Sequence, residues 1–309
     1  VYLSNDGNAT GSTVIGYGAG ASIAAGDNYN VFIGHQVADA DMTNATKNIG
    51  VGTFALGALT AGDGNVAIGY SAGYTLTTSS NNILIGDGAG ELLGGASQTD
   101  ADGTVAIGRS ALGALTSGIG NVSIGYQSMD ANQTSDYNTA VGYQALSALN
   151  DDGDTQNTAV GYKAGILITT GIRNTVLGAN ALITEDVGTR ATAIGAQSLG
   201  LQNSGSEVDT GNTAVGFAAG YNNVTGTNNT NIGSYAGYGG TGSNSDNTAV
   251  GMNALLSVTT GGQNVAIGKQ AADSITDGAE NVIVGDGAAQ TTTSVANSVI
   301  IGRGAAQNG

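Results

Sequence analysis

The chain has 309 residues, of which 54 are glycine and 40% are hydrophobic, and it lacks proline, cysteine and tryptophan. Its formal net charge is −16 with only seven basic residues and no basic run, which excludes nucleic-acid binding through phosphate contacts. The absence of cysteine excludes disulfides, thiolate metal sites and cysteine catalysis. No apolar run approaches the length that spans a bilayer, so we expect no membrane insertion by this segment.

One short phrase recurs from one end of the chain to the other. It reads NTAVGYQAL from Asn138 and NTAVGYKAG from Asn157, and its glycine serves as a marker for each unit. There are 17 marker glycines, and ten of the 16 spacings between them are 17 residues. The markers are Gly16, Gly34, Gly52, Gly69, Gly86, Gly108, Gly125, Gly142, Gly161, Gly178, Gly195, Gly216, Gly233, Gly251, Gly268, Gly285 and Gly302. The repeat predicts a single domain over residues 1–309, with no separate globular domain.

A short strand is predicted before every marker, beginning with residues 13–15 and ending with residues 299–301. In each unit the third residue before the marker is β-branched and the residue directly before it is aliphatic. This alternation is typical of a strand with one buried face, so we expect Thr139 and Val141 to point into a coil. With turn-rich segments between units, a unit of two short strands predicts one coil of a parallel β-solenoid. Seventeen coils stacked at about 4.8 Å would form a rod on the order of 80 Å long.

Three positions of the unit, which we call columns, carry structural predictions. The marker column, including Gly69, Gly125, Gly142 and Gly161, is invariably glycine, which indicates positive φ or tight contact. The column four residues earlier is asparagine in 13 units, including Asn121, Asn138 and Asn157, and predicts a ladder of side-chain amides. The column three residues after the marker, which includes Ala145, is small and indicates close approach of another backbone or chain.

The thinness of such a coil favours assembly. Isoleucine and valine alone would bury little apolar surface in each coil, which is marginal against chain entropy. We therefore expect a homotrimer in which three copies lie side by side with their alanine columns facing inward.

Three longer spacings predict loops, in chain order at residues 91–104, 147–156 and 199–211. Acidic residues gather in these and other turns as Asp39 with Asp41, Asp100 with Asp102, and Asp151, Asp152 and Asp154. We interpret them as solvated turns and expect no cofactor. Weak Ca²⁺ binding or paired-carboxylate catalysis are the alternatives for these acidic turns.

Aromatic residues recur directly after the marker. Tyr126, Tyr143 and Tyr162 belong to consecutive units and are predicted to stack, either as packing or as a surface platform for sugar rings. The single histidine, His35, occupies the same column and is interpreted as a repeat position rather than a catalytic base. A threonine row eight residues after the marker suits an ice-binding surface, but it is filled in only eight of the 17 units.

The repeated phrase N-[TV]-A-[VI]-G-Y-x-A resembles the head repeats of trimeric autotransporter adhesins, and more closely the 17-residue repeats of bacteriophage tail fibres. The resemblance covers residues 13–309 and implies a left-handed parallel β-solenoid, or β-roll, of about 17 coils in a homotrimeric fibre. It implies no enzymatic activity, but attachment to a host surface receptor, either a glycan or an outer-membrane component. The expected location is the virion tail fibre or, alternatively, the bacterial cell surface as an adhesin head. A polysaccharide-degrading enzyme is a further alternative.

The chain begins with Val1 rather than methionine. We therefore expect a fragment of a longer fibre protein.

Overall fold

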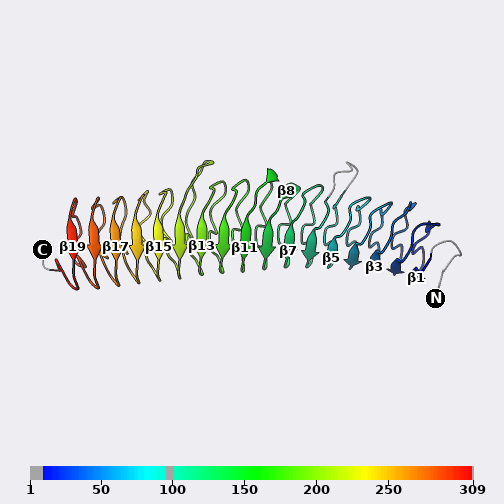
Figure 1. The fold of residues 1–309 in the computed structure, drawn as a ribbon, viewed down its shortest axis with the longest axis horizontal. Helices are drawn as coiled ribbons and strands as arrows, with labels where there is room; N and C mark the ends of the chain where they lie inside the picture. Colours follow the sequence, from blue (N-terminus) through cyan, green and yellow to red (C-terminus); the bar gives the residue numbers. More distant parts are fainter. Residues whose placement is uncertain (1–9, 95–100, 308–309) are drawn as a thin grey trace. The chain divides into compact units, whose positions relative to one another are not determined.

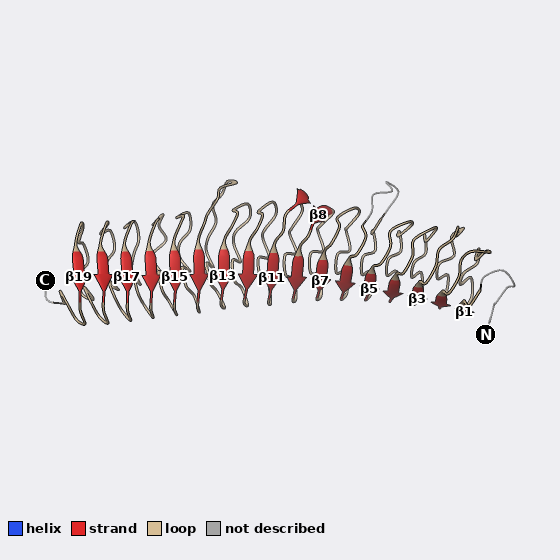
Figure 2. Ribbon diagram, in the orientation of Figure 1, coloured by secondary structure: helices blue, strands red, loops and turns tan. Residues whose placement is uncertain are grey.

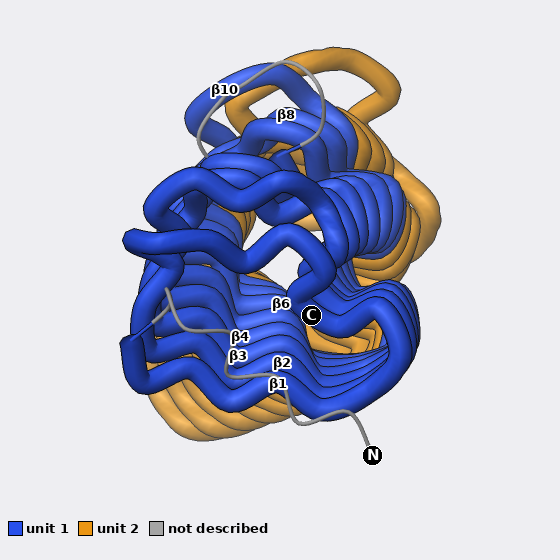
Figure 3. Tube along the Cα trace, turned by 90° about the vertical axis from the view of Figure 1, so that its right-hand side faces the viewer, with its two compact units in different colours: residues 1–156 blue, residues 157–309 orange. Residues whose placement is uncertain are grey.

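The computed structural model describes residues 10–94 and 101–307, which form a parallel β-solenoid without any helix in those ranges. Each coil contributes one short strand directly before its marker, and most other residues of the coil lie in turns and loops (Figures 1 and 2). The chain consists of two compact units, unit 1 with residues Val1–Gln156 and unit 2 with residues Asn157–Gly309 (Figure 3). The described part of the chain contains no helix capable of crossing a membrane.

Unit 1 contains a parallel sheet of eight three-residue strands that pair in chain order without any shift of register. These strands are β1 (Thr13–Ile15), β2 (Val31–Ile33), β3 (Ile49–Val51), β4 (Val66–Ile68), β5 (Ile83–Ile85), β6 (Val105–Ile107), β7 (Val122–Ile124) and β9 (Thr139–Val141). A second, two-stranded parallel sheet pairs β8 (Thr134–Asp136) with β10 (Asp152–Asp154), and β10 lies in the second predicted loop.

Unit 2 contains nine such strands, paired in the same manner from one coil to the next. They are β11 (Thr158–Val160), β12 (Thr175–Leu177), β13 (Thr192–Ile194), β14 (Thr213–Val215), β15 (Thr230–Ile232), β16 (Thr248–Val250), β17 (Val265–Ile267), β18 (Val282–Val284) and β19 (Val299–Ile301). The β-solenoid of about 17 coils predicted by the repeat is confirmed.

The predicted direction of the strand side chains is wrong. Ala140, at the centre of β9, is fully buried, whereas Thr139 and Val141 on either side of it are partly exposed. The same pattern recurs in the other strands that precede a marker, where the central residue is the less exposed of the three. A strand of three residues can place either its centre or its ends inside, and the small centre suits the narrow interior of a coil.

Most of the apolar interior comes from the segment that follows the marker. In the coil of Gly142, the side chains of Ala145, Leu146 and Leu149 have no exposed surface. Ala145 is thus buried by its own chain, and the expectation that the alanine column faces a sister chain is wrong. The leucine side chains supply the core that strand residues alone would lack, so the coil is less thin than its strand residues suggest.

Each coil holds one strand directly before its marker, whereas two strands per unit were predicted. The segment after the marker does not form a strand, because residues with positive φ alternate there with residues of negative φ. Gln36 and Ala38, two and four residues after Gly34, have φ values of 49° and 45°. The Gln36 amide donates to the Tyr17 carbonyl of the preceding coil, and the Ala38 amide donates to the Ala55 carbonyl of the following coil. The segment therefore stacks in register through backbone hydrogen bonds without being a β-strand.

The predicted asparagine ladder is confirmed inside both units. The backbone nitrogen of Asn138 donates to Asn121 Oδ1 at 2.9 Å, and Asn121 Nδ2 donates to the Ser135 carbonyl at 2.8 Å. In unit 2, the backbone nitrogen of Asn174 donates to Asn157 Oδ1 at 2.9 Å. The side chains are almost fully buried, so each amide replaces water as a partner for the backbone of the neighbouring coil.

The ladder changes where Ala191 replaces asparagine. Asn212 Nδ2 here donates to Gln202 Oε1 at 2.8 Å, and Gln202 Nε2 donates to Glu185 Oε2 at 2.9 Å. The other carboxylate oxygen of Glu185 accepts a hydrogen bond from the Ser204 hydroxyl at 2.8 Å. Glu185 is fully buried and Gln202 nearly so, and the column that holds Leu149 in unit 1 thus forms a hydrogen-bonded polar network here, beside apolar side chains such as Leu182 and Leu199 that stay buried.

Both predicted reasons for the marker glycine hold. The φ values of Gly69, Gly125, Gly142 and Gly161 lie between 138° and 143°, where side chains are strained. A Cβ atom on Gly161 would lie 2.6 Å from the carbonyl oxygen of Gly178 in the next coil. A methyl group therefore cannot be added without separating two coils.

Two glycine substitutions separate these effects. We expect Gly302→Ala, whose Cβ would meet only the Ala305 Cβ at 3.8 Å, to cost about 1–2 kcal/mol for its φ of 129°. We expect Gly268→Ala, whose Cβ would lie 2.5 Å from the Gly285 carbonyl oxygen at a similar φ of 134°, to cost about 1–3 kcal/mol more. Thermal and urea unfolding followed by circular dichroism measures the difference. Equal losses in the two variants would show that close approach between coils does not constrain this column.

Candidate functional site

The corner that follows the marker glycine gathers outward-facing aromatic side chains in both units. Its columns lie one, two and five residues after the marker. In unit 1, the Tyr17 and His35 rings stack with centroids 5.4 Å apart, and Phe54 meets His35 edge to face at 5.7 Å. Phe54 also contacts Tyr70 and Tyr74, at 6.0 and 6.1 Å. His35 is therefore part of an aromatic row, as its repeat position indicates.

The tyrosine stack predicted from consecutive units is confirmed for one pair. The Tyr126 and Tyr143 rings lie 5.2 Å apart and within 9° of parallel. The Arg109 guanidinium lies 5.9 Å from the Tyr126 ring centroid, within cation–π distance. Tyr162 belongs to unit 2, where Lys163 Nζ lies 5.3 Å from its ring centroid. A role of the three tyrosines in surface contact stays a prediction.

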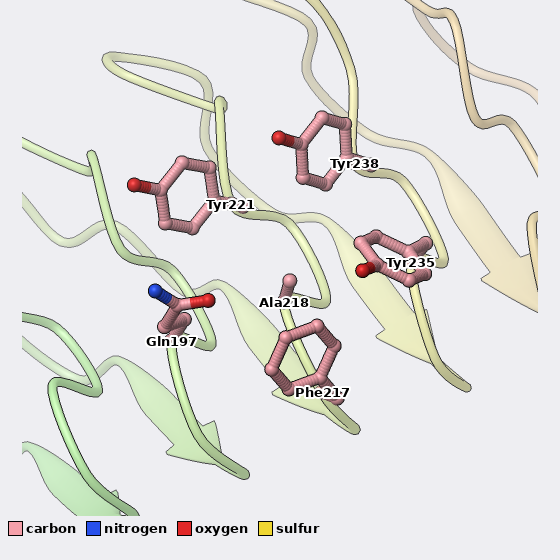
Figure 4. Close-up of a pocket in the computed structure, with 6 residues that line it drawn as sticks. All are labelled: Gln197, Phe217, Ala218, Tyr221, Tyr235 and Tyr238. Carbon is pink, nitrogen blue, oxygen red and sulfur yellow. The ribbon is translucent and has the colours of Figure 1, made fainter.

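A different group of aromatic residues encloses a hollow in unit 2. Its lining comes from three coils, those of Gly195, Gly216 and Gly233, and comprises Gln197, Phe217, Ala218, Tyr221, Tyr235 and Tyr238 (Figure 4). The Tyr221 and Tyr238 rings stack at 5.6 Å, and Tyr235 meets Phe217 and Tyr238 edge to face at 5.3 and 5.4 Å. The hollow has a volume of about 250 Å³ and contains no charged side chain in its lining.

The repeat explains how these side chains come together. Gln197, Ala218 and Tyr235 occupy the same column, two residues after the marker, in three successive coils. Ala218 is nearly fully buried and forms the floor, while its longer column neighbours rise on either side. Tyr221 and Tyr238 flank the floor from the column five residues after the marker, where Gly200 in the preceding coil leaves room for the Tyr221 ring.

Of these residues, only Phe217 belongs to the aromatic column directly after the marker. The signal for the others lies in two adjacent units, which read GFAAGY from Gly216 and GSYAGY from Gly233. Aromatic residues in the same or neighbouring columns of adjacent units must meet once the coils stack in register. Such a cluster is not visible when each column is considered by itself.

The polar groups around the hollow are available for a ligand. Within the described residues, the side chains of Gln197, Tyr221, Tyr235 and Tyr238 make no hydrogen bond. In the same column of unit 1, by contrast, Gln144 Nε2 donates to Gln127 Oε1 at 3.2 Å. Gln197 lacks such a partner because the next coil carries Ala218.

The acidic turns satisfy backbone groups instead of gathering as a metal site. Asp63 Oδ1 accepts hydrogen bonds from the Thr46 amide at 2.6 Å and hydroxyl at 2.9 Å, and Asp102 Oδ1 accepts one from the Ser80 amide at 2.6 Å. Residues 10–94 and 101–307 contain no group of three or more acidic or histidine side chains that could hold a metal ion. Asp100, part of one predicted pair, lies outside the described residues.

The threonine row is engaged with its own chain. The hydroxyls of Thr60, Thr116 and Thr259 donate to carbonyl oxygens of the following coil, at 3.1, 2.9 and 2.9 Å. Hydroxyls committed in this way hold adjacent coils together and are not free donors for a surface ligand.

A second outward surface follows the strands. The residues one and three places before the marker are threonine, valine, isoleucine or leucine in every coil, and none is charged. Ile68 in unit 1 and Ile267 in unit 2 have 39% and 41% of their surface exposed. Each unit thus presents a band of uncharged side chains, which are aliphatic directly before the marker and aliphatic or threonine three places before it, the kind of surface that marks an interaction face.

Two aspartates have partly buried carboxyl groups. Burial raises the pKa of the Asp130 carboxyl above its usual value, although a backbone hydrogen bond partly opposes the shift. Burial likewise raises the pKa of Asp273, against the effect of hydrogen bonds with Ser274 and Gln290. Both residues occupy the column that holds Tyr221 and Tyr238, so the side chains of this column are partly covered by their neighbours.

No protein-family model, no curated protein and no solved structure matches the chain.

The raised pKa of Asp130 predicts that removing its charge stabilises the fold, by an amount that depends on pH. A carboxyl whose pKa is higher in the folded state stabilises the fold below its unfolded value and loses that contribution as the pH rises through the folded value. We therefore expect Asp130→Asn to raise the Tm modestly at pH 7, and the gain to disappear near pH 3. Thermal unfolding at both pH values measures it.

The exposed Asp277→Asn variant is the control, because it removes the same charge from a protein of net charge −16 without relieving burial. A gain equal to that of the control at pH 7, or a gain that persists at pH 3, would contradict the assignment.

Proposed function

We propose that this chain is a structural fibre segment that mediates attachment to a host cell surface, most like the tail fibre of a bacteriophage. The observation that carries the proposal is the uncharged aliphatic band that every coil repeats along the strand columns. In an isolated chain the isoleucine side chains of this band stay in contact with water, which favours a partner that covers them.

Further copies of the same chain are the partner that fits this band best. Two chains that each carry a charge of −16 repel one another, so they must meet through a surface without acidic residues. The strand columns are free of charge in all 17 coils, whereas the acidic residues lie at other positions of the coil. Three parallel copies around a three-fold axis would cover the band of each chain, as the resemblance to trimeric fibres implies.

This interface replaces the one expected from the alanine column. Ala145 and its equivalents fill the interior of their own coils, and the isoleucine and valine side chains that were expected inside are the ones available for contact between chains. The regular spacing of 17 residues favours the phage-fibre type of repeat over the shorter unit of adhesin heads. The proposal assigns no catalytic step to the chain, whose single histidine is stacked on Tyr17.

Sedimentation equilibrium at neutral pH tests the assembly. We expect a mass three times the 30.0 kDa of one chain. The double variant Ile68→Lys/Ile267→Lys places one charge in the band of each unit, and we expect it to sediment as a monomer, because six ammonium groups would be buried without partners in the trimer.

The double variant Ala61→Lys/Ser294→Lys adds the same charge at exposed turns and should remain trimeric. A monomeric parent chain, or equal dissociation of both variants, would refute the proposed interface. Attachment is tested separately: the fluorescently labelled trimer should adsorb to the surface of bacterial cells, and uniform failure across encapsulated and unencapsulated strains would refute that part.

A further inference from the structure

We propose that the hollow over Ala218 in unit 2 is a binding site for an uncharged saccharide. The aromatic side chains of Phe217, Tyr221 and Tyr235 would contact the ring, and the amide of Gln197 would hydrogen-bond to its hydroxyls (Figure 4). The inference deepens the attachment function by naming the chemical class of the ligand. It rests on that function only for the natural source of the saccharide.

The chemistry of the lining selects this class. A pyranose ring presents C–H groups on its faces and hydroxyls around its edge, so it needs apolar surface and a few hydrogen-bonding groups side by side. Aromatic rings with polar ends provide both. Here Phe217 offers an apolar ring with 45% of its surface exposed, and Tyr235 offers a ring and a hydroxyl with 37% exposed.

The absence of charge in the lining separates neutral from acidic saccharides. None of the six lining residues is basic, and the protein carries a net charge of −16, so an anionic ligand would gain no ion pair and would meet a repulsive field. A divalent cation bridging the sugar is not supported either, because the lining contains no carboxylate.

The geometry of the column sets this place apart from other aromatic clusters. The Tyr126 and Tyr143 rings stack in parallel at 5.2 Å, which is too close to admit a ligand between them. In unit 2 the small Ala218 interrupts its column, so that Gln197 loses the amide partner that Gln127 has in Gln144. An open floor thus lies beside an unpaired amide.

Tyr235 is held at the hollow in a conformation that bulky residues rarely adopt. Its φ is 57°, in a column that elsewhere holds mostly glycine, glutamine, asparagine or serine. The left-handed region is unfavourable for a residue with a Cβ atom. Its ring closes the side of the hollow opposite Gln197, where it contacts Phe217 and Tyr238.

Binding is tested with soluble saccharides and the intact 309-residue chain. Cellotriose, maltotriose and chitotriose serve as neutral probes and trigalacturonate as the acidic one, each titrated to about 20 mM, above the millimolar affinity of a shallow site. Saturation-transfer NMR and tyrosine fluorescence report binding, and the absence of tryptophan leaves tyrosine as the emitter. We expect at least one neutral probe to bind and trigalacturonate to bind at least about tenfold more weakly.

Two variants test the lining of the site: one fills the floor of the hollow and the other removes an aromatic ring. Ala218→Gln extends the side chain from a backbone with φ 51°, which matches the 52° of Gln144, so the new amide can pair with Gln197 and fill the floor without loss of stability. Phe217→Ala removes the exposed ring. We expect each variant to weaken the neutral probe about tenfold or more, while Tyr137→Ala, at an exposed tyrosine of unit 1, leaves binding unchanged.

The outcomes are distinct from those of the assembly experiment. Unfolding midpoints and sedimentation are measured on every variant, so that loss of binding with an unchanged midpoint and mass reports on the hollow alone. Absence of binding by all neutral probes, stronger binding of trigalacturonate, or equal loss in Tyr137→Ala would each overturn the proposal. A trimer that binds no saccharide would leave the fibre function standing and refute only this site.

Discussion

The whole fold depends on the close stacking of each coil on an identical backbone. At the marker column, the glycine Cα lies so near the carbonyl group of the next coil that no Cβ atom fits, and the backbone amides on either side donate to the coils before and after. Every residue in a column must therefore tolerate its own copies at one strand spacing. Asparagine satisfies this condition through its amide, alanine and leucine through apolar contact, and tyrosine through ring stacking.

This constraint explains which features could be predicted from the sequence. The marker glycine, the asparagine ladder and the strand before each marker follow from the backbone, which repeats without variation, so a recurring residue type reports directly on a recurring conformation. The position of every strand before a marker was predicted correctly. The Tyr126–Tyr143 stack follows from the same logic.

The errors have a common physical origin. In a strand such as Thr139–Val141 all three residues are compatible with burial, so alternation alone does not determine which side faces inward. Volume decides it: Ala140 lies inside, together with Leu146 and Leu149 from the turn, and the β-branched residues remain outside. The leucines were not recognised as core because they lie in a segment rich in left-handed residues, where periodicity does not resemble a strand or a helix. The hollow of unit 2 escaped prediction because it arises from a local combination of neighbouring residues, not from a residue type that recurs in one column.

The left-handed positions that follow the marker have a further consequence for how such a chain can change. At the position two residues after it, the backbone accepts glycine, serine, glutamine, lysine, phenylalanine and tyrosine with nearly the same φ. Conformation and side-chain identity are thus uncoupled there, while the interior columns remain restricted. A few substitutions at this corner of the coil can therefore change which ligand the surface binds, while the backbone of the solenoid stays the same.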